Sequence, residues 1–359
     1  MESLLEIVHF LSSKACNGRR VGTEGWKNAQ DFICRQLKLA SIPPLGEEYL
    51  ETLPQLAGGL EGKNILAVVP GNGLLAERYL LIEAHYDHLG EDEEEMGYFP
   101  GADDNAAAVA IILHTAKDYL QTKDSHNCRS LIIASFDSEE PPFFNSPDMG
   151  AERFCEMHPE LLPKIDLAIV LDLMGHGAAI HGECSRLQDS FFVAGAEKCG
   201  IGPVMDSISR SIPELYPQRI GNHAIPPLGN YIAFQKRKKP FLFMTSGRNK
   251  YYHSLFDSAE RLDYPKIQRT VQYLSLLVRK LSTLEPHSYI YNEKAYDDLS
   301  TLLSLKELFD CLGHGFNDSA RINDFLEHSV ALCRKNGNLN EFERSKLHHL
   351  LAILEKALQ

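Results

Sequence analysis

The stretch YLLIEAHYD, residues 79–87, establishes the fold class from which the rest of the chain can be interpreted. Residues 79–84 are apolar nearly throughout and show no regular polar alternation, as in strands that are buried on both faces. His85 and Asp87 follow where this strand ends. Because successive strand residues point to opposite faces, these two side chains point the same way. The stretch therefore predicts a buried strand that carries polar groups at its carboxyl end.

Similar short runs of branched apolar residues occur elsewhere in the sequence, at 64–69, 130–136, 167–171 and 240–244. Helical spacing of apolar residues is clearest in 105–120, and two further helices are expected over 2–15 and 24–40. Strands and helices thus alternate, which predicts an α/β fold with a largely parallel central sheet flanked by helices. Ligands of such sheets bind beyond the carboxyl ends of the strands.

The pattern changes after about residue 285, where strand signals end. Leucine-rich helical spacing predicts three amphipathic helices, centred on residues 299–309, 322–330 and 347–358. We therefore expect a catalytic domain over 1–285 and a helical C-terminal appendage over 286–359. An appendage of roughly 70 residues is marginal as an independent fold, so we expect it to pack on the catalytic domain or to mediate a homo-oligomer.

Composition excludes several classes of protein. The net charge of −13 disfavours nucleic acid as a partner, and the chain has no run of 18 apolar residues that would span a membrane. Residues 1–15 show no signal-peptide pattern, so we expect a cytoplasmic protein unless an export signal has been removed. The eight cysteines form no C-x-x-C pair, and we expect reduced, mostly buried thiols.

Acidic residues and a histidine follow the other predicted strands or precede a helix. Each of these residues could have a purely structural role instead of a chemical one. Asp103 and Asp104 could cap the helix that follows, the glutamates after residue 136 could form a solvated loop, and a lone histidine is more often structural than a ligand. The candidates that could carry chemistry are Asp104, Glu139, Glu140, Asp172 and His253, together with His85.

Taken together, these residues indicate a metal centre. Imidazole and carboxylate ligands suit zinc or a similar cation, and a catalytic zinc takes about three protein ligands. Five ligands are therefore too many for one ion. One carboxylate shared between two ions roughly 3.5–4 Å apart resolves the count. Of the two adjacent glutamates, one could bind metal while the other accepts a proton from water.

The ordered motifs H-Y-D, G-A-D-D-N, E-E, L-D-L-M-G and Y-H-S resemble those of the co-catalytic zinc aminopeptidase family. That family includes the bacterial leucyl aminopeptidases and is related to glutamate carboxypeptidase II. The resemblance extends from about residue 19 to about residue 267, and it includes the segment GRRVGT at 18–23. It implies the zinc exopeptidase fold for the catalytic domain.

The resemblance also implies roles for individual residues. It implies removal of the N-terminal residue from peptides with a free N-terminus by a water that two Zn²⁺ ions per chain activate. The implied ligands are His85 and Asp172 for one ion, Glu140 and His253 for the other, and Asp104 between them. Glu139 would be the general base, Asp87 would orient His85, Asp257 would orient His253, and Tyr252 would either stabilise the oxyanion or serve as a packing tyrosine.

One departure from the family pattern leaves alternatives open. Residues 229–231 stand where the family usually has S-D-H, and Asn230 replaces the acid. Glutaminyl cyclase, a transferase that resembles the same fold and uses one zinc, is the first alternative; its additional acidic residue would fall near Asn230. A non-catalytic binding protein on this fold, like the transferrin receptor ectodomain, is the second, although such proteins lose ligands that are present here.

Overall fold

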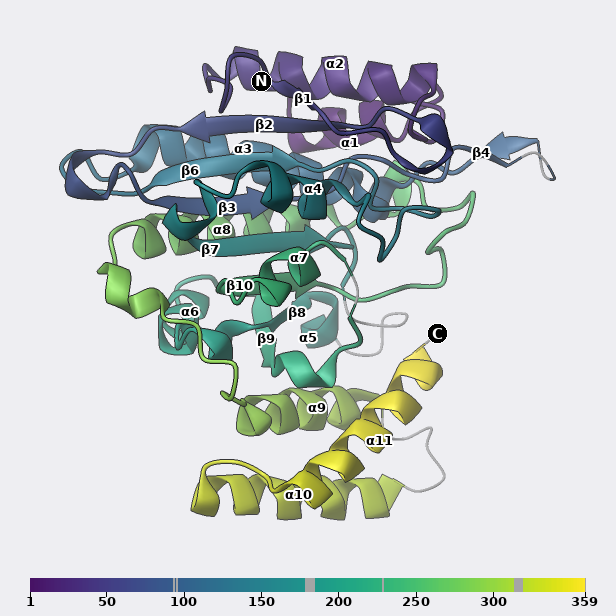
Figure 1. The fold of residues 1–359 in the computed structure, drawn as a ribbon. Coiled ribbons are helices and arrows are strands. Elements are labelled where there is room, and N and C mark those ends of the chain that lie inside the picture. The colour runs from purple at the N-terminus through teal and green to yellow at the C-terminus, as the bar shows by residue number, and fades with distance from the viewer. Residues whose placement is uncertain (93, 95, 178–184, 228, 313–318, 359) are drawn as a thin grey trace.

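The computed structural model describes residues 1–92, 94, 96–177, 185–227, 229–312 and 319–358. Its centre is an eight-stranded mixed sheet in the order β1-β2-β6-β3-β7-β10-β8-β9 (Figure 1). The strands are β1 (Leu50–Thr52), β2 (Lys63–Val69), β3 (Tyr79–Glu83), β6 (Ser130–Ser135), β7 (Ile165–Asp172), β8 (Ser190–Ala194), β9 (Tyr216–Ile220) and β10 (Phe241–Thr245). A separate small hairpin pairs β4 (Glu91–Asp92) with β5 (Gly97–Tyr98).

The four central strands β6, β3, β7 and β10 run parallel to one another, whereas β2 and β8 on either side of them are antiparallel. Their side chains are buried on both faces of the sheet: in β3, Leu80 and Ile82 join one hydrophobic cluster and Leu81 joins another. A strand that is buried on both faces needs apolar residues at nearly every position. The predicted α/β fold with a largely parallel sheet is therefore confirmed.

Helices cover both faces of this sheet (Figure 1). The larger hydrophobic cluster joins one face to α1 (Leu4–Leu11), α2 (Glu24–Leu39), α3 (Ala107–Thr122), α6 (Gly202–Ser209) and α8 (Tyr264–Ser282). The other face packs against α4 (Gly150–Met157) and α7 (Tyr231–Lys236). The short helix α5 (Ser185–Gln188) precedes β8. The predicted helices over 2–15, 24–40 and 105–120 correspond to α1, α2 and α3.

Within the central sheet, the strands that the sequence analysis missed are β1, β8 and β9, which lie toward its two ends. β1 has only three residues, and β9 has the mixed sequence YPQRI with four half-buried positions. Short edge strands with polar residues and proline carry little periodic signal.

The three predicted C-terminal helices are present as α9 (Asp298–Leu312), α10 (Ser319–Asn336) and α11 (Glu341–Leu358). They share a hydrophobic cluster that also takes in Leu187. Helix α9 lies along edge strand β9: the Gly221 amide donates to Thr301 Oγ1 at 2.7 Å, and Ser304 Oγ donates to the Arg219 carbonyl at 2.9 Å. The division of the chain at residue 285 stays a prediction.

Two smaller expectations concern thiols and membranes. Cys16, Cys34, Cys128, Cys155, Cys199 and Cys333 are all buried free thiols, as the sequence predicted for most of the eight. Cys184 and the side chain of Cys311 lie outside the described residues. Within the described part of the chain, no helix is both long and apolar enough to cross a membrane.

Candidate metal centre

The candidate ligands gather at one edge of the sheet because the strands before them are parallel neighbours. His85 follows β3, Glu139 and Glu140 follow β6, and Asp172 is the last residue of β7. His253 lies eight residues beyond the end of β10. Since β6, β3, β7 and β10 are adjacent in that order, their carboxyl ends bring these side chains to one place.

Asp104 comes from an irregular turn, Ala102–Ala106, that precedes α3. The turn begins at Gly101 in the left-handed region (φ 59°), where a Cβ would lie 2.3 Å from the Asp104 carbonyl oxygen. A larger residue could not take that place without moving the Asp104 backbone. The possible capping role is not realised, because the N-cap of α3 is Ala106 and no side chain caps it.

Buried Arg19 ties this turn to the loop after β3. Its guanidinium donates to the carbonyl oxygens of Tyr86 (2.9 Å), Pro100 (2.8 Å) and Gly101 (3.0 Å). It also donates to the Leu11 carbonyl at 2.6 Å. Because these bonds reach the backbone next to His85 and just before Asp104, Arg19 fixes the spacing of the two ligand-bearing segments.

Asp257 supports the same turn rather than His253. Its two carboxylate oxygens accept hydrogen bonds from the backbone amides of Asp103 (2.9 Å) and Asp104 (3.1 Å). The orientation of His253 that the family resemblance implied for Asp257 is therefore corrected. Burial and the nearby Asp103 and Asp104 carboxylates raise the pKa of Asp257 to about 6.

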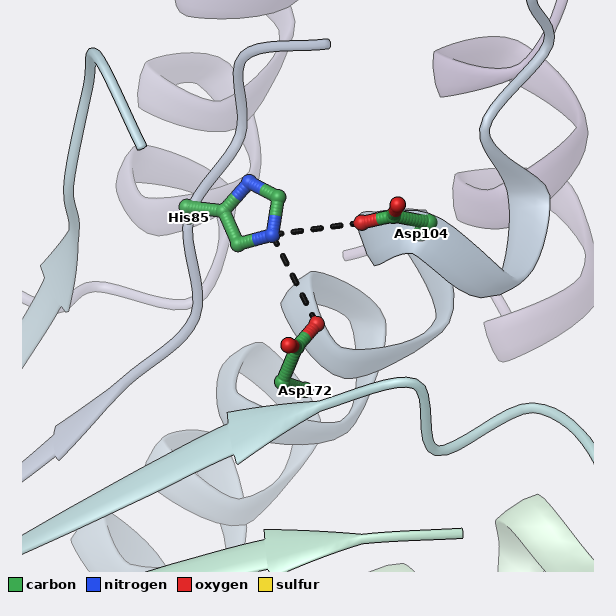
Figure 2. A group of neighbouring side chains, drawn as sticks. All are labelled: His85, Asp104 and Asp172. Carbon is green, nitrogen blue, oxygen red and sulfur yellow. Dashed lines mark ion pairs between the residues drawn. The ribbon is translucent and has the colours of Figure 1, made fainter. Parts of the chain in front are cut away.

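The first ligand group consists of His85, Asp104 and Asp172 (Figure 2). His85 Nε2 lies 3.3 Å from Asp104 Oδ1 and 3.6 Å from Asp172 Oδ1. Ligand atoms bound to one tetrahedral zinc at about 2.0–2.1 Å lie roughly 3.3 Å from each other. The three side chains are thus spaced as ligands of one ion would be.

The second group uses the other oxygen of the same aspartate. His253 Nε2 lies 3.2 Å from Asp104 Oδ2 and 3.2 Å from Glu140 Oε2. Asp104 Oδ1 therefore faces one group and Oδ2 the other, which is the arrangement that a bridging carboxylate needs.

His88 is a further member that the sequence analysis missed. It is fully buried, its Nδ1 lies 2.7 Å from Glu140 Oε1, and it forms a possible metal-holding group with Asp104 and Glu140. The 2.7 Å contact has the length of a strong hydrogen bond, as expected for a histidine that orients a ligating carboxylate. The available signal was its position directly after the H-Y-D motif.

Asp87 connects the first group to the two glutamates. Its carboxylate accepts hydrogen bonds from the amides of Glu139 and Glu140, each at 3.1 Å. His85 Nδ1 lies 3.3 Å from the Asp87 carbonyl oxygen and 3.6 Å from its carboxylate. Asp87 thus contacts His85 as the resemblance implies, and it also fixes the backbone of the E-E pair.

Excess negative charge dominates the electrostatics of the centre. Burial raises the pKa of Glu139 well above its ordinary value, and repulsion from Glu140, Asp172 and Asp104 adds to the increase. Burial lowers the pKa of His85, but the surrounding carboxylates reverse this and raise it well above its ordinary value. Without a cation, the cluster therefore tends to hold protons.

A metal ion fits this chemistry. His85 Nε2, Asp172 Oδ1 and His253 Nε2 are buried without hydrogen-bond partners among the described residues. Buried unpaired polar atoms are costly, and cations held by the two groups would satisfy all three atoms while offsetting the clustered negative charge. Nitrogen and oxygen ligands of this kind suit zinc.

A second missed residue lies behind the first group. Glu83 of β3 is buried, and Asn230 Nδ2 donates to its Oε2 at 3.3 Å. Burial raises the pKa of Glu83 to about 8, although His85 and Asn230 counteract this. Asn230, which directly precedes α7, thus lies beside an acidic residue of β3. A lone glutamate in the apolar run YLLIEA was the available signal.

The centre opens into a cavity of about 1,320 Å³. Asp104, Glu139, Glu140, Asp172 and His253 lie in its wall, as does Tyr252. The Tyr252 ring stacks on the His253 ring with centroids 3.8 Å apart. Burial raises the pKa of Tyr252, so its hydroxyl stays protonated at neutral pH.

Two known proteins are similar to parts of this chain. Uncharacterized protein YfbL of Escherichia coli (strain K12) is 27% identical over 237 residues, which cover 58% of this chain and 68% of YfbL. Glutaminyl-peptide cyclotransferase of Drosophila melanogaster is 30% identical over 164 residues, 44% of each chain.

Solved structures share the fold. A Zn-dependent exopeptidase from Parabacteroides distasonis superposes with a TM-score of 0.58 at 19% identity, over 77% of this chain and 97% of that one. The family model of peptidase family M28 matches residues 64–278, a range that contains every candidate ligand. The resemblance inferred from the sequence motifs is thereby confirmed, and the chain belongs to peptidase family M28.

Proposed function

We propose that this protein is a zinc-dependent aminopeptidase that removes the N-terminal residue from peptides. The observation that carries the proposal is the divergence of two adjacent glutamates. Glu140 contacts His88 and His253 with its two carboxylate oxygens. The Glu139 carboxylate lines the cavity, lies 3.8 Å from His85 Nε2, and accepts no hydrogen bond from the described residues. Glu139 is therefore free to take a proton.

Zinc would be held by His85, Asp104, Asp172, Glu140 and His253, with Asp104 between two ions. Bound there, zinc supplies a Lewis acid that polarises the peptide carbonyl and makes water easier to deprotonate. These ligands come from four strand ends and one turn, so the fold itself sets their spacing.

Glu139 moves the proton in this proposal. It takes a proton from the attacking water and delivers it to the amine nitrogen as the peptide C–N bond breaks. Burial and neighbouring carboxylates raise its pKa, which favours proton uptake by a group that must later release the proton. Asp87 holds the Glu139 amide and thereby the position of the base.

Tyr252 is the proposed oxyanion donor. Its ring is held against His253, its hydroxyl stays protonated, and it lines the cavity next to the ligands. A protonated hydroxyl can donate a hydrogen bond to the negative oxygen that develops on the attacked carbonyl.

Two matched variants test the division of roles between the glutamates. Glu139→Gln should keep the zinc content of the wild type and reduce kcat by about a hundredfold or more, since general-base catalysis contributes roughly 10²–10⁴. Glu140→Gln should reduce both zinc content and kcat. Zinc is measured by plasma mass spectrometry on dialysed protein. Full activity in Glu139→Gln would refute the base assignment.

Glutaminyl cyclisation is the second candidate, favoured by the 30% identity to the Drosophila glutaminyl-peptide cyclotransferase. That reaction would release ammonia from an N-terminal glutamine without consuming water. The shared use of Asp104 by two ligand groups supports the hydrolase, because the cyclase alternative uses one zinc.

A further inference from the structure

A row of cations lines the cavity beside the metal centre. Arg248, Lys250 and Arg261 all lie in its wall, on or just after the loop that carries His253. Tyrosine rings hold them in place: the Arg248 guanidinium lies 4.7 Å from the Tyr252 ring centroid. Lys250 and Arg261 lie 5.0 Å and 4.5 Å from that of Tyr251. Such a row is unexpected in a chain of net charge −13 with an acidic centre in the same cavity.

The charge of Arg248 is available to a ligand. It is exposed and forms no salt bridge with any residue in the described ranges. Glu260 lies in the cavity wall next to Arg261 and offsets part of that charge, so Arg248 is the stronger candidate. A planar guanidinium binds a carboxylate through two parallel hydrogen bonds.

The distance from the metal centre limits which carboxylate could reach Arg248. The Tyr252 ring lies 3.8 Å from the His253 ring, and Arg248 lies 4.7 Å from Tyr252. The guanidinium is therefore no farther from His253 than about three residues of extended chain, at 3.3–3.6 Å each. A peptide cleaved at the metal centre would need only one or two residues after the scissile bond to reach it.

The C-terminal helices close another part of the same cavity. Leu305 and Leu308 of α9 and Leu351 and Ala352 of α11 line its wall. This apolar wall restricts the space into which a longer peptide could extend, and it offers no charge to a carboxylate. The cationic row and the helical wall therefore line the same cavity as the metal centre.

We propose that Arg248, supported by Lys250 and Arg261, binds a carboxylate of the substrate on the leaving-group side of the scissile bond. The expected substrates are short peptides, and the carboxylate is their C-terminus or an acidic side chain at the second residue. This proposal rests on the proposed aminopeptidase function and specifies its substrate class.

The test compares kcat/KM for three sets of peptides on zinc-loaded protein. The sets are dipeptides X-Ala with a free carboxylate, the same dipeptides as C-terminal amides, and X-Asp amides, where X is varied over the common amino acids. We expect the wild type to prefer the free acid to the amide by about tenfold or more. Arg248→Met should bring that ratio close to one. Arg210→Met, at an exposed arginine outside the cavity wall, is the matched control and should keep the wild-type ratio.

The outcomes separate the two proposals. Equal cleavage of all three sets of peptides by the wild type, or unchanged wild-type preferences among them in Arg248→Met, would overturn the carboxylate site and leave the aminopeptidase intact. Cleavage of longer peptides but of no dipeptide would likewise overturn the carboxylate site. Efficient cleavage of X-Asp amides would assign the carboxylate to a side chain, and poor cleavage would assign it to the C-terminus. Failure to cleave any peptide would count against the proposed function itself.

Discussion

At the scale of single residues, Asp104 has the most demanding position in the centre. Its two carboxylate oxygens face different groups, with Oδ1 3.3 Å from His85 Nε2 and Oδ2 3.2 Å from His253 Nε2. Asp172 lies in only one of these groups. The two aspartates should therefore differ in how many ions depend on them.

Asp104→Ala should lose both zinc ions, whereas Asp172→Ala should lose one and retain the other. The physical reason is that removal of the shared carboxylate leaves each group short of a ligand and takes away the charge that offsets two close cations. Zinc per chain after dialysis measures this, with circular dichroism to check that each variant folds. Two ions still bound to Asp104→Ala would exclude the bridging role.

The sequence could predict the site residues that lie in recognisable motifs. It could not predict those that join the site only through contacts with residues far away in the sequence. His85, Asp104, Glu140, Asp172 and His253 were chosen because each stands at a strand end or a helix start, and the structure brings them together. His88 and Glu83 carried no motif of their own. Their roles depend on contacts with Glu140 and Asn230, which are 52 and 147 residues away in sequence.

At the scale of elements, the buried strands could be predicted and the exposed ones could not. β3, β6 and β7 are apolar because both of their faces are covered, and that constraint is visible in the sequence. β9 is an edge strand with mixed residues, and its pairing with β8 depends on register rather than composition. The contact of α9 with β9 could not be predicted either. Amphipathic spacing shows that one face of a helix is buried, but it does not identify the element that covers this face.

At the same scale, Asp298 connects α9 to α11 among the C-terminal helices. It lies at the start of α9, and its buried carboxylate accepts hydrogen bonds from Arg344 of α11 (2.7 Å) and from the Leu339 amide (2.9 Å). His223 Nε2 lies 3.0 Å from the same carboxylate. Contacts with His223, Arg344 and Leu339 hold its pKa below the ordinary value despite burial, which acts in the opposite direction.

Asp298→Asn should lower the free energy of unfolding by about 1.5–3 kcal/mol at neutral pH, the value of hydrogen bonds to a charged group. Because the folded pKa is depressed, the stabilisation is present above the ordinary pKa of about 3.9 and is lost as the pH falls through the folded value. Urea unfolding at a series of pH values should thus show a constant difference from the wild type at neutral pH that shrinks in acid.

The control for Asp298→Asn is Lys306→Met, which removes an ion pair between α9 and α10 in which Glu327 is largely exposed. Surface pairs contribute little, so this variant should unfold close to the wild type at every pH. An Asp298→Asn protein as stable as Lys306→Met would show that Asp298 does not anchor the helices.

At the scale of the whole molecule, one cavity combines parts that are far apart in the sequence. The metal centre comes from residues 85–253, whereas one wall comes from α9 and α11. Figure 1 shows the C-terminal helices at the β9 side of the sheet, with α11 turning back toward the edge at which the strands end. The order of the motifs could predict the family and the fold. The position of α9 and α11 in the cavity wall could not be predicted, because it depends on tertiary packing that the local sequence pattern does not encode.

Mass spectrometry on pooled peptides with varied N-terminal residues, including glutamine, tests the central claim most directly. The pool is incubated with zinc-loaded protein and with metal-stripped protein. We expect only the zinc-loaded protein to release single N-terminal residues, with one water added at each cleavage. Loss of ammonia from the glutamine peptide alone would contradict the aminopeptidase and support the cyclase, and unchanged masses throughout would contradict both.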